Sequence, residues 1–418
     1  MINNATISTL FVSQKRGSDA FSGFEREDHG TYQGPLKTVE AALERVRNMR
    51  AVGSKHPVRI VLTDDIYFVT KPIVVTNDID QITICSDCKT VISGGLPVCG
   101  FREDVFNGKK CFSAHIPQVE QGQWFTDFFV DGRRAGYTSF PKEGFFAAQD
   151  VENKSDDFRE GSRWFIPYPE DREYFKSLRN FDDCFVSYNH FWVDEHSPID
   201  RFEEDTGKIW MKYLSRFSIH DANPCAKMRW KLENAAEAFE LPNQWYLDRQ
   251  TAMLYYIPAD EAQTPENIQG YLAVAKQLFV VQGDKENQVN YITFQNLTFS
   301  HTASDYASRF DTDTHAPIES DHPGFACDEQ AMCNAYGAVE LRYAHGCNVE
   351  RCLFTGLGLH GITVENGCDH IRVYANRFYR MGGGAVKING GAYGCEKCEE
   401  TWGNTVIQDC RMLSNLQY

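Results

Sequence analysis

Val339-Glu340-Leu341 is the first of three short patterns in which a polar residue lies between two apolar ones. Ile362-Thr363-Val364 follows 23 residues later, and Val386-Lys387-Ile388 a further 24 residues on. A period near 24 residues, made of short β-prone runs with glycines between them, is typical of coils that stack on one another. Each coil is too small to bury its own apolar face, so it must lie on its neighbours. The pattern predicts an all-β chain folded as a parallel β-helix.

A second apolar pattern interleaves with the first in the same part of the chain. Its four copies begin 55, 24 and 34 residues apart and occupy residues 294–299, 349–354, 373–378 and 407–412. Two interleaved patterns indicate two strands in each turn of the coil, which we call a rung.

The rhythm of the chain predicts three regions. Residues 1–95 are expected to form an N-terminal cap and the first rungs, with a capping helix over 38–47 that begins at Thr38. Residues 96–270 have irregular spacing and many aromatics, which predicts an inserted β-rich domain. Residues 271–418 are expected to resume the rungs, with loop insertions at 300–335 and 390–403.

The net charge of −16, from 42 basic and 58 acidic residues, argues against a nucleic-acid partner. No apolar run approaches the roughly 18 residues of a membrane-spanning helix, so no membrane partner is expected. The N-terminus lacks the pattern of a secretory signal, and 14 cysteines suit a reducing compartment, so the sequence predicts a cytoplasmic protein. The alternative is a mature secreted chain with disulfides. Nothing in the sequence determines an oligomeric state.

Strand alternation predicts which polar side chains share a face. With Val339 and Leu341 pointing into the core, Glu340 points outward. Stacking the rungs then builds two outward columns: Glu340–Thr363–Lys387 and Arg342–Glu365–Asn389.

Glu340 and Glu365 are the first candidates for catalysis. Neighbouring rungs place them on the order of 8 Å apart, a separation that suits an inverting glycosidase because a water fits between the carboxylates. We expect Arg342, Lys387 and Asn389 to orient sugar hydroxyls. The alternative is a solvated sheet face whose charges alternate in sign.

The acidic loop at 300–335 supplies a second candidate pair, Asp328 and Glu329. Hydrolysis of a glycosidic bond needs a proton donor and a base or nucleophile, and carboxylates in different environments supply both. Gln330, and His360 on a later rung, are further candidates for substrate binding. The alternative is a solvated acidic loop.

Four cysteines in the two loop insertions form a candidate zinc site. Cys395 and Cys398 have the CxxC spacing of zinc ligands, and Cys327 and Cys333 are a looser pair. Such a zinc ion would be structural, and the predicted hydrolysis itself requires no cofactor.

Several short segments together resemble glycoside hydrolase family 141, a group of carbohydrate-active enzymes with fucosidase and xylanase activities, and next the related β-helix xylosidases. The segments are 10–13 (LFVS), 17–19 (GSD), 34–42 (GPLKTVEAA), 91–95 (VISGG), 129–135 (FVDGRRA), 245–249 (WYLDR) and 291–294 (YITF). The resemblance spans nearly the whole chain. It implies a right-handed parallel β-helix with an inserted β domain, a carbohydrate substrate, and cleavage of glycosidic bonds by a carboxylate pair.

Two departures from that family leave alternatives open. Its members run well past 418 residues, whereas residues 415–418 break off in the middle of a predicted rung, and the cysteine-rich insertions are not part of its pattern. The chain is therefore expected to be a glycoside hydrolase, or else a polysaccharide lyase or a non-catalytic carbohydrate-binding β-helix, including a truncated enzyme.

Overall fold

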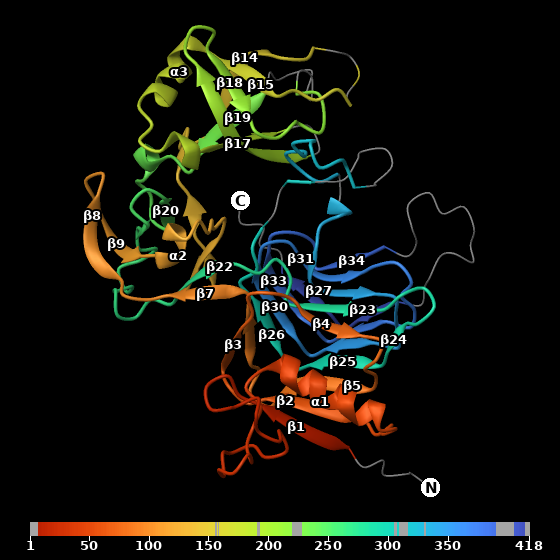
Figure 1. Ribbon diagram of the computed structural model, residues 1–418. Coiled ribbons are helices and arrows are strands. Elements are labelled where there is room, and N and C mark those ends of the chain that lie inside the picture. Colours follow the sequence, from red (N-terminus) through yellow and green to blue (C-terminus); the bar gives the residue numbers. More distant parts are fainter. Residues whose placement is uncertain are drawn as a thin grey trace. The chain divides into compact units, whose positions relative to one another are not determined.

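The computed structural model describes residues 7–154, 157, 159–189, 193–219, 228–304, 307–308, 317–329, 332–389 and 405–413. The chain forms two compact units. Unit 1 comprises Met1–Leu96, Tyr271–Ser304 and Tyr336–Tyr418, and unit 2 comprises Pro97–Gly270 and Asp305–Ala335. Because the chain leaves unit 1 and returns to it, strands from opposite parts of the colour scale lie side by side there, as β5 and β25 do (Figure 1).

Unit 1 contains three sheets in which every strand pairs in parallel with its neighbours. The first is a sheet of seven strands, in the order β1 (Ser8–Val12), β2 (Val58–Leu62), β5 (Ile82–Ser86), β25 (Ile292–Gln295), β29 (Asn348–Glu350), β32 (Arg372–Tyr374) and β35 (Val406–Gln408). The second has six strands, in the order β3 (Ile66–Phe68), β6 (Val91–Ser93), β26 (Thr298–Ser300), β30 (Leu353–Leu357), β33 (Arg377–Met381) and β36 (Arg411–Leu413).

The third parallel sheet carries the residues of most interest for function. Its order is β4 (Ile73–Thr76), β23 (Phe279–Gln282), β27 (Gly337–Arg342), β31 (His360–Val364) and β34 (Val386–Ile388). A two-stranded parallel pair, β24 (Val289–Asn290) with β28 (Ala344–His345), accompanies it.

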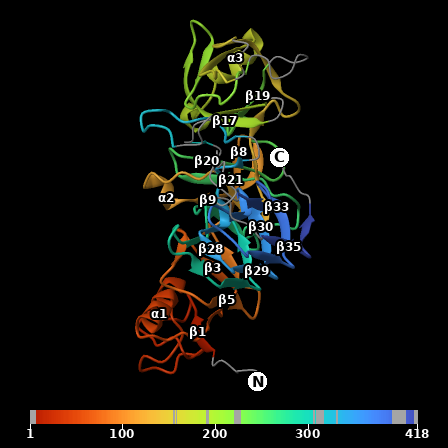
Figure 2. The same cartoon turned by 90° about the vertical axis from the view of Figure 1, so that its right-hand side faces the viewer.

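One apolar core joins the strands of unit 1 to helix α1 (Val39–Ala51). The helix begins where the Thr38 hydroxyl accepts the Ala41 N–H, as the sequence predicted. Its buried residues include Leu43 and Val46, which belong to the same cluster as Leu10 of β1. Figure 2 shows α1 next to β1 from a second direction. Among the described residues, no helix is long and apolar enough to cross a membrane.

Unit 2 consists mainly of antiparallel strands. A five-stranded sheet has the order β12 (Gly136–Tyr137), β20 (Gln244–Asp248), β21 (Met253–Tyr256), β9 (Lys109–His115) and β8 (Arg102–Phe106). A seven-stranded sheet has the order β13 (Ser139–Phe140), β19 (Arg229–Glu233), β14 (Phe146–Val151), β15 (Trp164–Pro167), β18 (Lys208–Met211), β17 (Asp194–Glu203) and β16 (Phe185–Asn189).

The remaining elements are short. The strands are β7 (Gly95–Val98), β10 (Phe128–Val130), β11 (Arg133–Arg134) and β22 (Gly270–Ala273). The helices are α2 (Pro117–Glu120) and α3 (Pro169–Lys176), with 3-10 turns at Phe181–Asp183 and Ala236–Ala238.

The predicted fold class, a right-handed parallel β-helix with an inserted domain and an N-terminal cap, is wrong. The structure is a β-rich chain of 42% strand and 9% helix, with several sheets and a closed six-stranded barrel, and it is not a β-helix solenoid. The sequence repeat forecasts which short strands pair in parallel, but a pairing register does not determine how whole sheets close. It also carries no information on unit 2, where antiparallel pairing dominates.

Candidate active site

Parallel pairing of β27, β31 and β34 aligns the residues that the repeat predicted to align. Glu340 pairs with Thr363, and Thr363 pairs with Lys387. Main-chain hydrogen bonds continue the alignment past the strand ends, from Glu365 N–H to the Leu341 carbonyl and from Asn389 N–H to that of Val364. Figure 1 shows these strands side by side. The short repeat therefore brings distant polar residues onto one side of a single sheet.

The expected exposure of this side of the sheet is wrong. Glu340 is 5% exposed, Thr363 0% and Glu365 8%. The alternative of a solvated face with alternating charges is therefore wrong for these residues as well. Strand alternation determines which residues share a side, but it does not say what covers that side. Buried carboxylates need partners, because an unpaired buried charge is strongly unfavourable.

Glu340 is held by two donors within unit 1. The amide of Gln277 donates to Oε2 at 2.9 Å, and the Arg342 guanidinium donates to Oε1 at 3.0 Å. Burial raises the pKa of Glu340 above its usual 4.5. Glu365 adds to that rise, whereas Arg342 and Lys387 oppose it, and burial prevails. Glu340 therefore keeps a proton to higher pH than an ordinary glutamate.

Glu365 has a different environment. The Lys387 ammonium lies 2.8 Å from its Oε1, and the Asn389 amide donates to its Oε2 at 3.3 Å. The side chains of Lys387 and Glu365 are 12% and 10% exposed. Each of the two glutamates thus has one cation and one amide as partners, and burial raises the pKa of Glu340.

Asp328 and Glu329 belong to unit 2 and have other partners. Asp328 accepts hydrogen bonds from the main-chain N–H groups of Glu329 and Asn334, at 2.9 and 2.7 Å, and from the Asn334 amide at 2.9 Å. These bonds join Asp328 to Glu329 and Asn334. Glu329 lies 3.6 Å from the buried guanidinium of Arg216. Both acids thus have local partners that stabilise unit 2.

The predicted substrate-binding residues fall into three groups. Arg342, Lys387 and Asn389 all belong to the cluster around Glu340 and Glu365. His360 is buried at the start of β31, where its Nδ1 accepts the Gly384 N–H at 2.8 Å. Gln330 lies outside the described residues.

The predicted zinc ligands are only half described. Cys327 is buried and Cys333 half-buried, both in unit 2, whereas Cys395 and Cys398 lie outside the described residues. Burial raises the pKa of the Cys327 thiol. Within the described part of the chain, neither Cys327 nor Cys333 joins a group of three potential metal ligands. The four-cysteine site remains a prediction.

Gln277 is a contact of the cluster that sequence reasoning missed. It precedes β23, which pairs with β27 so that Phe279 lies opposite Val339. The signal was available, since Lys276-Gln277 is a polar pair directly before an apolar strand of the same sheet. Without the pairing of β23 and β27, however, nothing connects Gln277 with Glu340.

Comparison with solved structures identifies the type of fold. A structure titled "Glycoside hydrolase" superposes with a TM-score of 0.73 at 17% identity, covering 97% of this chain and 73% of the other. The chain has a glycoside hydrolase-like fold. A structure titled "The complex structure of XylC with xylose" aligns with a TM-score of 0.44 at 12% identity, covering 97% of this chain and 54% of the other. No family model and no curated protein matches the sequence.

Proposed function

We propose that this chain is a glycoside hydrolase that cleaves an oligosaccharide or polysaccharide by acid/base catalysis, with Glu340 and Glu365 as its two carboxyl groups. One observation carries the proposal: two glutamates carried by neighbouring strands of one sheet are both buried among polar partners, and burial raises the pKa of one of them, Glu340. Two carboxyl groups are the usual acid and base of glycoside hydrolysis.

Glu340 is assigned the role of general acid. Its raised pKa favours the protonated form, which can give its proton to the departing glycosidic oxygen. The Gln277 and Arg342 donors fix the carboxyl group, so the proton is presented in one direction. The carboxylate left after proton transfer is stabilised by the same two donors.

Glu365 is assigned the role of the ionised partner. Lys387 holds its carboxyl group in place, where it can take a proton from water or stabilise the positive charge that develops at the sugar carbon. The separation estimated from strand geometry, on the order of 8 Å, leaves room for that water and favours inversion of configuration.

The neighbouring polar groups would hold the sugar. Asn389 and Arg342 carry more donors than the glutamates use, and Arg342 is 43% exposed at its side chain. The similarity to a structure titled as a glycoside hydrolase supports the assignment through the shared fold, at 17% sequence identity. A polysaccharide lyase is less well supported, because Lys387, the lysine that would take the proton next to a uronate, already pairs with Glu365.

The test is release of products from a panel of plant and microbial polysaccharides and aryl glycosides. We expect new reducing ends without the ultraviolet absorbance of an unsaturated uronate, and we expect Glu365→Gln to abolish turnover while the circular dichroism spectrum is unchanged. Glu350→Gln is the matched control, because Glu350 is a part-buried carboxylate of unit 1 that pairs with Arg351. Wild-type activity in Glu365→Gln would remove the assignment, and glycan binding with no product would favour a non-catalytic binding protein.

A further inference from the structure

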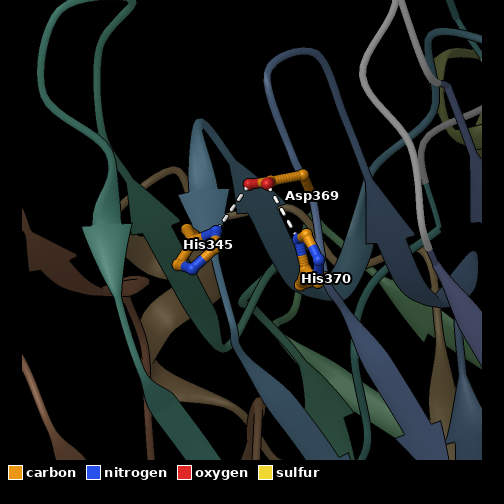
Figure 3. Close-up of side chains that lie close together, drawn as sticks. All are labelled: His345, Asp369 and His370. Atoms are coloured by element: carbon orange, nitrogen blue, oxygen red, sulfur yellow. Dashed lines mark hydrogen bonds and ion pairs between the residues drawn. The ribbon is translucent and has the colours of Figure 1, made fainter.

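Two histidines and an aspartate of unit 1 meet at one point on the surface (Figure 3). Nδ1 of His345 lies 2.9 Å from Oδ1 of Asp369, and Nδ1 of His370 lies 2.9 Å from Oδ2. One nitrogen or oxygen atom from each residue lies within 4.8 Å of the other two. Among the described residues this is the one group of three or more histidine, cysteine or acidic side chains so close together.

Parallel strand pairing creates this group from residues that are 24 positions apart. His345 ends β28 and forms a parallel bridge with Asp369. The Asp369 N–H donates to the Ala344 carbonyl at 3.0 Å, and the Gly346 N–H donates to the Asp369 carbonyl at 3.1 Å. The two side chains therefore start from neighbouring backbones in register.

A left-handed backbone at His370 completes the group. Consecutive residues of a strand point to opposite sides, but His370 has φ +55° and reaches the carboxylate of its own neighbour Asp369. The residues at the same corner of the two preceding strands, Tyr291 and Gly346, have φ of 58° and 62°. A side chain at Gly346 would collide with the Tyr291 ring, so the glycine lets that ring pack beside His345.

Further contacts orient the three side chains. The Gln288 amide donates to Oδ1 of Asp369 at 3.0 Å and also to the Gly367 carbonyl at 2.9 Å. The Tyr291 hydroxyl lies 3.4 Å from Nε2 of His345. Groups that hold the second ring nitrogen of a histidine or the second oxygen of a carboxylate are what metal ligands usually have around them.

We propose that His345, Asp369 and His370 form a site for a divalent transition-metal ion, with Zn²⁺ as the preferred occupant. Two imidazole nitrogens and one carboxylate oxygen are a common three-ligand set for zinc, which leaves one position for water. Softer sulfur ligands are absent from this described group, and histidine nitrogens disfavour Mg²⁺ and Ca²⁺, which take oxygen.

The three ligand atoms must shift to surround the ion. Zinc bonds of about 2.0–2.2 Å in a tetrahedron place ligand atoms roughly 3.4 Å apart, and the potential ligand atoms of the three residues lie within 4.8 Å of one another. Each Nδ1 must give up its proton, which the neutral ring then carries on Nε2. For His345, that Nε2–H faces the Tyr291 hydroxyl. The His370 side chain is 60% exposed, so the ion enters from solvent.

Isothermal titration of the chelator-treated protein with zinc chloride tests the site. We expect His370→Ala to bind one zinc ion per chain fewer than the wild type. Asp369→Asn should bind that ion at least about tenfold more weakly. Magnesium chloride is expected to give no binding here. His56→Ala is the matched control, because His56 is an exposed histidine of unit 1 outside the group, and it should bind zinc as the wild type does.

Because the chain has 14 cysteines, two measurements separate this site from thiolate sites. Cobalt bound here should show visible d–d bands without the near-ultraviolet charge-transfer band of a cobalt–thiolate bond. Anomalous scattering from wild-type crystals soaked in zinc should place a peak between Asp369 and the two rings. Equal zinc stoichiometry and affinity in the wild type and both variants would overturn the proposal, and so would an anomalous peak found only elsewhere. The three hydrogen-bonded side chains would then only stabilise the surface of unit 1.

Discussion

The Lys387 ammonium lies 2.8 Å from Oε1 of Glu365, although the strand register pairs Lys387 with Thr363. The ion pair therefore runs diagonally between the two predicted columns. Glu340, which shares a column with Lys387, instead takes Arg342 from its own strand. Each buried glutamate thus has its own cation, Arg342 for Glu340 and Lys387 for Glu365.

Replacing Glu340 by glutamine should remove the acidic proton but keep the size and shape of the side chain. We expect turnover of natural glycans to fall by about 10²–10⁴-fold, the usual contribution of a general acid. Aryl glycosides whose leaving group needs no proton should lose much less. Kinetics of Glu340→Gln on both substrate types, beside the Glu350→Gln control, check this, and equal losses on the two would show that Glu340 is not the acid.

Replacing Lys387 by methionine should destabilise unit 1. The substitution leaves the Glu365 carboxylate buried without its cation, which costs about 3–5 kcal/mol when a buried pair is broken. Urea unfolding should show this loss. The control is the exposed Lys285, because Lys285→Met should change the free energy of unfolding by no more than about 0.5 kcal/mol. A similarly small change for Lys387→Met would mean that the pair contributes little.

The raised pKa of Glu340 predicts how stability depends on pH. Between 4.5 and its folded-state pKa, the folded protein holds a proton that the unfolded chain has released. This contribution to stability is therefore complete below pH 4.5 and is lost as the pH rises through the folded-state value. Unfolding curves at several pH values should show the wild type losing stability relative to Glu340→Gln over that window. Parallel pH profiles of the two proteins would contradict the assignment.

His301 should make the protein less stable as the pH falls, which is the opposite of the effect of Glu340. It is buried, shares a hydrogen bond of 2.9 Å with the Ser93 hydroxyl, and stacks on Tyr271. Burial lowers its pKa from 6.5 to about 4. Between these two pH values the unfolded chain binds a proton at His301 that the folded protein does not bind. The free energy of unfolding therefore falls by about 3 kcal/mol as the pH falls from 6.5 to about 4.

The variant His301→Gln should lose less stability than the wild type between those pH values, and the exposed His29→Gln should behave as the wild type. The imidazole resonances of His301 should titrate near pH 4 in a nuclear magnetic resonance experiment. Titration near 6.5 would show that the ring is not kept from solvent.

The prediction of strand pairing succeeded where the evidence was local. The 23- and 24-residue spacings align Glu340, Thr363 and Lys387, and the structure pairs them in that register. The fold class failed because closure of sheets depends on contacts that no short repeat encodes. The exposure of Glu340 and Glu365 failed for a similar reason, since alternation gives the side but not its surroundings.

The sequence by itself determined which residues could share a sheet and a side, because side-chain direction along a strand has a period of two. Only the tertiary structure decided that the side carrying Glu340 is buried, that Lys387 pairs with Glu365, and that His370 turns back to Asp369. Those outcomes depend on burial, on diagonal distances of a few ångströms and on a left-handed corner, which are properties of the folded chain.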